Sequence, residues 1–210
     1  MSSNFAYRYV SITPEHTTST GARSYGTASA GGSAKIYGEV DDESFMHNFD
    51  LMTRADMSRY GAAKSVNGKE FSEGGINLVI QADDFCGILF YGAYGDNASC
   101  NSNNYINTVN KHKMSEGLDH ILPSFTLEVG REDKEHTYTG MCLSRLSVSG
   151  SVGEYATMSV DFSGKAESAT SALATPTFAG ATVEGLHFAE GTVSFSSDNS
   201  TVVASSNIKS

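Results

Sequence analysis

Apolar and small polar residues alternate along three consecutive segments in the second half of the chain. These segments are residues 124–130, 136–149 and 155–163, separated by a charged turn at 131–135 and a Gly-rich turn at 150–153. Successive side chains of a strand point to opposite faces, so each segment has one apolar and one polar face. Three such segments in a row predict an antiparallel meander. Its apolar face is expected to hold Phe125, Leu127, Val129, Leu146, Val148, Met158, Val160 and Phe162.

Shorter strands are expected on either side of this meander. Residues 6–13, 34–40 and 75–81 contain the β-branched and aromatic residues that are typical of strands. Two last strands are expected at residues 186–196 and 201–207. The chain is therefore predicted to be mainly β.

One helix is predicted at residues 83–95. This stretch is apolar on almost every face, its two leading aspartates suit a helix N-terminus, and Gly95 suits the position after its end. A buried strand is the alternative, because periodicity does not separate the two for a short apolar run. Residues 41–69 allow a further short helix, since apolar residues recur there at helical spacing at Phe45, Phe49 and Met52.

Long segments without periodicity separate these elements. Residues 17–33 and 53–69 are longer than ordinary connections in a compact domain, and such loops usually carry function or form interfaces. Arg, Tyr and Met are enriched at the cores of protein interfaces, and both loops contain them. Residues 165–181 are expected to be a linker before the last strands of a single domain, 1–210. The interface candidates in the two loops are Arg23, Tyr25, Arg54, Met57, Arg59 and Tyr60.

Composition narrows the class of protein. Ser, Thr and Gly make up about a third of the 210 residues, and aromatic residues make up 10%, more than a disordered chain would carry. The net charge of −10 is spread over both halves, without the Lys/Arg patch that marks nucleic-acid affinity, so tight DNA binding is not expected. The longest apolar run, residues 85–94, is about half the length of a membrane-spanning helix. No secretory signal is visible, and no membrane insertion is expected.

The sequence shows no signature of catalysis. It lacks the GxSxG and HExxH motifs, a Walker loop and a dinucleotide-binding fingerprint. Its six histidines never fall at metal-ligand spacing, and its three cysteines form no CxxC pair, which indicates reduced and mostly buried thiols. Adjacent carboxylates, such as those at 83–84 and 132–133, are explained by helix capping and solvated turns. The sequence therefore predicts a binding or assembly protein with no enzymatic activity, no metal and no cofactor.

One region has the residue order of a known family. Residues 124–168 resemble the tail tube proteins of tailed bacteriophages, in which a strand of the type FTLEVG precedes a charged hairpin, Y-x-G-x-x-x-x-x-L-x-x-S, a short Gly turn and x-x-S-V-x-F-x-G. The residues before this region also have a similar order: Tyr-x-x-Ile-x-Pro-Glu, an arginine-containing loop, Gly-Gly-Ile-x-Leu and a closing Tyr-Gly. The resemblance covers about residues 5–195. The matching positions are Tyr9, Ile12, Pro14, Glu15, Gly74, Gly75, Ile76, Leu78, Tyr94, Gly95, Tyr138, Gly140, Leu146, Ser149, Gly153, Ser159, Val160, Phe162 and Gly164.

The resemblance implies both a fold and a role. The implied fold is an antiparallel β-sandwich or barrel subunit with one short flanking helix and long interface loops, whose strands join an inner β-barrel shared by several subunits. The implied role is that of a non-enzymatic virion protein: six copies form a ring, and stacked rings form the tail tube that delivers the genome into the bacterial host. The implied partners are further copies of the chain and other tail proteins, such as sheath, tape measure, terminator and baseplate, with assembly in the host cytoplasm. DNA would pass without sticking, since a basic pore would retain its phosphates.

The polar face of the meander is a candidate lining for such a tube. Its carboxylates outnumber its bases, which suits a surface that repels DNA. The same face can equally be the solvated outside of a sandwich. A second function, a non-enzymatic β-sandwich that binds a glycan or a protein receptor, would need a concave site lined by aromatic residues. A third is a hydrolase with a dispersed site. The lumen-facing candidates are Glu128, Ser147 and Asp161.

Overall fold

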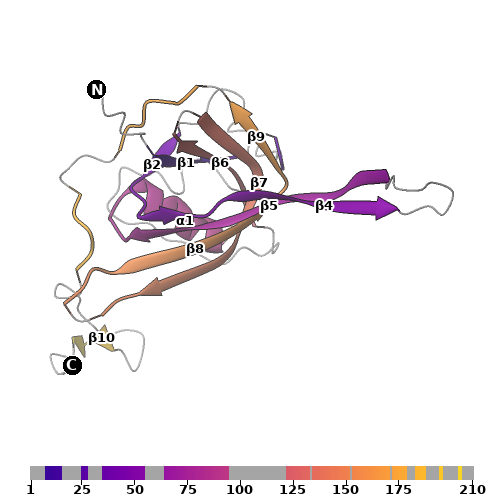
Figure 1. Ribbon diagram of the computed structural model, residues 1–210. Coiled ribbons are helices and arrows are strands. Elements are labelled where there is room, and N and C mark those ends of the chain that lie inside the picture. Colours follow the sequence, from indigo (N-terminus) through magenta and orange to yellow (C-terminus); the bar gives the residue numbers. More distant parts are fainter. Residues whose placement is uncertain are drawn as a thin grey trace, which may run out of the picture.

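The computed structural model shows a mainly β protein with one helix in the residues it describes (Figure 1). Those residues are 8–15, 25–27, 35–54, 64–94, 122–132, 134–151, 153–170, 172–178, 183–187, 194–195 and 203–204. The strands are β1 (Tyr9–Pro14), β2 (Ile36–Gly38), β3 (Asp42–Glu43), β4 (Met46–Arg54), β5 (Lys64–Val79), β6 (Ser124–Arg131), β7 (Lys134–Ser149), β8 (Thr157–Gly164), β9 (Ala166–Thr170), β10 (Ser194–Phe195) and β11 (Val203–Ala204), and the helix is α1 (Asp84–Tyr94). The predicted fold class is confirmed.

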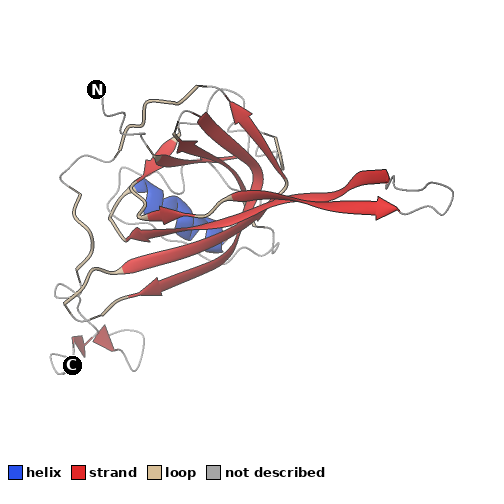
Figure 2. Cartoon of the chain, in the orientation of Figure 1, coloured by secondary structure: helices blue, strands red, loops and turns tan. Residues whose placement is uncertain are grey.

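Nine of the strands form one antiparallel sheet. Its order is β2-β1-β6-β7-β8-β5-β3, with β4 also paired to β5 and β9 to β7. The sheet curls, and α1 lies between its upper and lower strands (Figure 2). The outermost strands, β2 and β3, are joined by residues 39–41 alone, yet no pairing connects them among the described residues. The curled sheet is therefore not closed into a barrel.

The predicted meander is confirmed by the neighbouring strands β6, β7 and β8. Antiparallel pairing brings Leu127 opposite Tyr138 and Leu146 opposite Val160. Two bulges interrupt β7, and each adds one residue to this strand relative to its partner. Gly140 lies at the first bulge with a φ of +68°, a conformation that glycine adopts without strain. A single alternation therefore does not run the length of β7.

The core forms between α1 and the inner face of the sheet. Six of the eight expected core residues are buried, and Leu146 packs partly buried against them. Val148 was expected in this core, and that expectation is wrong, because its side chain is 53% exposed. It lies beyond the last β7 residue that pairs with β6, where the sheet is narrower. The core includes three further β7 residues that the alternation did not predict: Tyr138, Met141 and Leu143.

The predicted helix is confirmed as α1. Its N-terminus is capped by Asp83, whose Oδ1 accepts a hydrogen bond from the Cys86 backbone N–H at 2.8 Å. Burial raises the pKa of the Asp83 carboxyl above its ordinary value. The helix sits close against β2, because a Cβ at Gly38 would collide with the Phe85 ring. In the described part of the chain, no helix has the length and apolarity needed to span a membrane.

The helix considered within residues 41–69 does not form in the described parts of that range, 41–54 and 64–69. The chain here makes β3 and β4, and β5 then returns as a strand from Lys64. The two long strands extend beyond the body of the molecule as a hairpin arm, which we call the β4–β5 arm (Figure 1). Residues 55–63 of the predicted loop lie outside the described residues.

One expectation for the last third of the chain needs revision. Residues 166–170, expected in a linker, form β9 and pair with the first part of β7. In the predicted last strands, β10 and β11 pair with each other, and most of the remaining residues of both ranges lie outside the described residues. Residues 185–187 make backbone contacts with the ends of β5 and β8 through Leu186.

Candidate assembly interface

One half of the sheet, made of β2, β1, β6 and the first part of β7, has side-chain layers on both faces. On the face away from α1, the Lys35 ammonium lies 2.5 Å from a carboxylate oxygen of Glu128. The Tyr9 hydroxyl donates to Glu135 and accepts a hydrogen bond from the Ala174 backbone N–H at 2.8 Å. A later segment of the chain therefore covers this half from outside.

A buried carboxylate fixes the described part of the first long loop. Glu15 is 2% exposed and accepts hydrogen bonds from Thr126 Oγ1 at 3.0 Å and from the Gly140 N–H at 2.7 Å. Its second oxygen accepts from the Gly26 N–H at 2.8 Å. These bonds compensate the burial of the carboxylate and attach the loop to the sheet. The neighbouring Tyr25 side chain is left exposed.

The other half of the sheet has an open polar face. It consists of β5, β8 and the second part of β7, which pair so that residues on the side away from the core fall opposite one another. Arg145 lies opposite Asp161 with 3.6 Å between Nε and Oδ2, and Ser147 lies opposite Ser159. The side chains of this face, which we call the open polar face, are mostly polar: Glu73, Asn77, Val79, Arg145, Ser147, Ser149, Thr157, Ser159, Asp161 and Ser163.

The three lumen-facing candidates are placed differently. Ser147 and Asp161 belong to the open polar face, and Ser147 is exposed. Glu128 lies on the same side of the sheet but in the covered half, where its side chain is 14% exposed. Burial lowers the pKa of Lys35 and the Glu128 carboxylate raises it, with a net upward shift that reflects this ion pair. The Glu128 charge is thus largely neutralised within the subunit.

Two strand edges bound the open half. Residues 144–149 of β7 pair with β8 on one side, and no described strand pairs with them on the other. β4 pairs with β5 and has no second described neighbour. An unpaired edge presents a row of free N–H and C=O groups that can pair with another chain.

The β4–β5 arm exposes apolar side chains on both faces. Phe49 and Leu51 lie on one face of β4 by alternation, and Met52 lies on the other, opposite Val66 of β5. All four side chains are more than half exposed. Residues 64–71 of β5 extend beyond the last pair with β8, which corresponds to roughly 25 Å at about 3.3 Å per residue. Exposed apolar groups of this kind mark interaction sites.

The interface candidates in the loops are only partly described. Tyr25 is exposed beside the Glu15 contacts, and Arg54 is the last residue of β4. Arg23, Met57, Arg59 and Tyr60 lie outside the described residues. Their role in assembly therefore stays a prediction.

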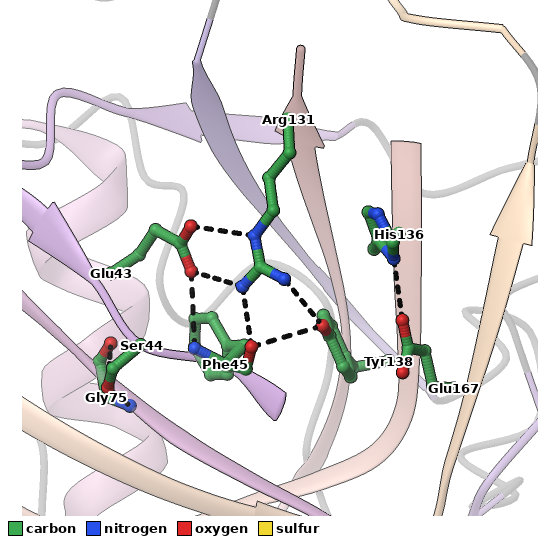
Figure 3. Close-up of polar contacts among 8 residues, drawn as sticks. All are labelled: Glu43, Ser44, Phe45, Gly75, Arg131, His136, Tyr138 and Glu167. Carbon is green, nitrogen blue, oxygen red and sulfur yellow. Dashed lines mark hydrogen bonds and ion pairs between the residues drawn. The ribbon is translucent and has the colours of Figure 1, made fainter. Parts of the chain in front are cut away.

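Several charged residues near the β6–β7 turn make side-chain contacts within the subunit. Glu135 is buried, and His136 Nδ1 lies 2.6 Å from Glu167 Oε1 on β9 (Figure 3). Arg131 contacts Glu43 and the Phe45 carbonyl oxygen, far away in the sequence. The sequence gives no local signal for these pairs, because each partner comes from a different part of the chain.

The described residues offer little for small-molecule chemistry. A cavity of about 280 Å³ opens between β2 and β3 and is lined mainly by polar and acidic residues, with Phe178 as its one aromatic side chain among them. Within the described ranges, no three His, Cys, Asp or Glu side chains come together as metal ligands would. Cys86 is buried and Cys142 half-buried, both as free thiols, and burial raises the pKa of Cys86 to about 12.

Comparisons with known proteins place the chain in a family. No curated protein matches it significantly. Among solved structures, it is similar to the tail of an empty gene transfer agent particle with C6 symmetry (11% identity, TM-score 0.46, covering 77% of this chain and 95% of that chain). It is also similar to a chain of the anti-feeding prophage baseplate (3% identity, TM-score 0.47, 81% and 96% covered) and to Hcp protein (10%, 0.34, 78% and 99%). The assignment rests on the family model described as "Phage tail tube protein", which matches residues 9–209. The chain therefore belongs to the phage tail tube proteins, the structural subunits of the tail tube.

Proposed function

We propose that six copies of the chain form a ring by joining their open sheet halves edge to edge. The observation that carries this proposal is the pair of unpaired edges, on β4 and on residues 144–149 of β7, at opposite sides of one sheet. A contact between two different edges is heterologous, and it closes into a ring when the rotation between copies fits. Closure would remove both free edges at once. The number six is the one that the family resemblance implies.

In this ring the open polar face lines the lumen. Ser147 and Asp161 are the lumen-facing candidates on this face, and Arg145 is paired to Asp161 within the subunit. A lining without free basic groups gives DNA phosphates little to bind, so the genome stays mobile. The net charge of −10 per chain supports the same conclusion, because a narrow channel concentrates the potential of repeated charges.

The β4–β5 arm packs between neighbouring copies. A two-stranded ribbon is only marginally stable in water, and this one exposes apolar side chains on both faces. Burial against another subunit accounts for both features. Arg54 at the end of β4, and Met57, Arg59 and Tyr60 in the sequence between β4 and β5, are proposed to contact the same neighbours, and Tyr25 with Arg23 to form a second contact.

Stacked rings then form the tube of a virion tail. Copies of the chain are its principal partners, and other tail proteins such as sheath, tape measure, terminator or baseplate contact the outside or the ends. Assembly takes place in the host cytoplasm, and the role in genome delivery includes no catalytic step.

A matched pair of substitutions tests the role of the arm. Phe49 on the arm and Tyr94 at the end of α1 are exposed to a similar extent, 56% and 54%. Burying a Phe side chain at an interface contributes about 1.5–3 kcal/mol, so Phe49→Thr should raise the concentration needed for polymerisation about tenfold or more. Tyr94→Thr should change it less than about twofold. Polymerisation followed by sedimentation measures both, and an unchanged threshold for Phe49→Thr would refute the proposed packing of the arm.

A further inference from the structure

The arm leaves the body at the two residues between β3 and β4, Ser44 and Phe45, which we call the joint. There, the Ser44 backbone N–H donates to the Gly75 carbonyl oxygen at 3.0 Å, and the Gly75 N–H donates to Ser44 Oγ at 3.0 Å. The ring of Phe45 is buried 5.5 Å from that of Tyr138 and 5.9 Å from that of Phe162. The joint therefore lies against both β5 and the core.

Arg131 links this joint to the opposite side of the curled sheet. It stands at the end of β6, and its guanidinium points between Glu43 and Tyr138 (Figure 3). Nε and one terminal nitrogen donate to the two oxygens of Glu43 at 2.8 and 2.6 Å. The same terminal nitrogen donates to the Phe45 carbonyl oxygen at 2.6 Å, and the other donates to the Tyr138 hydroxyl at 3.3 Å.

The contacts that Arg131 makes with Glu43, Phe45 and Tyr138 are strong. A two-point contact between a guanidinium and a carboxylate is among the firmest side-chain interactions in proteins. Burial tends to raise the pKa of Glu43, but the bonds and charge of Arg131, helped by the Phe45 N–H, hold it below its ordinary value. The pKa of Arg131 is raised, chiefly by its hydrogen bonds to Glu43. Both groups are thus charged and mutually paired at neutral pH.

For the arm, the place of these Arg131 contacts in the fold matters more than their strength. Because β2 and β3 do not pair with each other among the described residues, the β3–β4 segment lacks a backbone neighbour on the side that faces β2. Arg131 spans this gap from β6, 88 residues away in the sequence from Glu43. The backbone that it holds, Glu43 to Phe45, runs directly into the arm at Met46.

We infer that Arg131 is a positioning residue that fixes the direction in which the β4–β5 arm leaves the subunit. It acts through Glu43 and the Phe45 carbonyl rather than by touching a neighbouring copy. Lysine does not replace it, because a single ammonium lacks the rigid fork that reaches the carboxylate and the carbonyl together. The consequence for assembly rests on the proposed packing of the arm between copies; the positioning itself does not.

The inference is tested on the full chain kept unassembled at low concentration. Arg131→Gln should speed hydrogen exchange about tenfold or more at the backbone amides of 44–49 and 70–75, since a charged hydrogen-bond pair is lost. Amides of residues 125–129 should change less than about threefold. Arg131→Lys should resemble Arg131→Gln, and polymerisation of both variants should need a higher concentration.

His136→Gln is the matched control. It removes a half-buried side-chain contact with Glu167 that touches neither the arm nor its joint. Exchange at 44–49 should therefore stay within about twofold of the unmodified chain. Unchanged exchange at the joint in Arg131→Gln, or an equal rise there and at 125–129, would overturn the inference.

A second variant covers the case in which Arg131→Gln does not fold. Glu43→Gln keeps Arg131 and its bonds to Phe45 and Tyr138 and removes only the carboxylate charge. A rise in exchange confined to the joint supports the inference, and no rise refutes it. If the joint loosens as expected but the unmodified chain never forms tubes, the proposed function fails while the positioning role stands.

Discussion

Val160 and Val148 have the same side chain and opposite surroundings. Val160 is fully buried in the core, whereas Val148 is 53% exposed near the far end of β7. The sequence pattern predicts both in one apolar face. Exposure follows from position in the sheet, because Val148 pairs with Met158 of β8 but has no β6 residue on its other side.

This difference gives a stability prediction. Val160→Ala removes two buried methyl groups and leaves a cavity, so it should lower the free energy of unfolding by about 2 kcal/mol. Val148→Ala should lower it by less than about 0.5 kcal/mol in the unassembled subunit. Urea unfolding measures both, and equal losses would show that the register of β7 and β8 is wrong.

Charged residues near the β6–β7 turn mark the limit of sequence reasoning at this scale. A charged run between two alternating strands predicts a turn correctly. It does not predict that Arg131 and His136 contact carboxylates on β3 and β9, because those partners are set by how the whole sheet is arranged. Glu15 is similar: its three bonds come from three other segments.

At the level of elements, the parts that bury their own apolar face within the subunit were predictable. The meander and α1 show alternation, capping and a continuous apolar run, which are local signals. The β4–β5 arm was not predictable, because its apolar side chains lie on both faces and mimic helical spacing. β9 has the sequence AESAT, without any apolar alternation, and forms through pairing with β7.

The N-terminus of α1 offers an element-level prediction. Asp83→Ala removes the acceptor for the Cys86 N–H and should lower the free energy of unfolding by about 1 kcal/mol. Asp83→Asn keeps an acceptor and should lower it by no more than half as much. Chemical denaturation of the two variants is the measurement, and a larger loss for asparagine would show that charge rather than capping matters here.

At the scale of the whole molecule, the two halves of the sheet differ in how their faces and edges are covered. Its covered half carries layers on both faces and holds α1, the Glu15 contacts and the Lys35–Glu128 ion pair. Its open half has one small polar face, two unpaired edges and a projecting arm. Ser and Thr supply about half of the side chains on the open polar face, which keeps that face small and polar.

The most direct test of the central claim is a cryo-EM map of the tube assembled from the full chain. The account predicts a hollow six-fold tube in which β4 of one copy pairs with residues 144–149 of the next. Ser147 and Asp161 should face the lumen, and α1 should lie outside the inner barrel. A tube lined by α1, or one in which these two strand edges stay apart, would contradict the account.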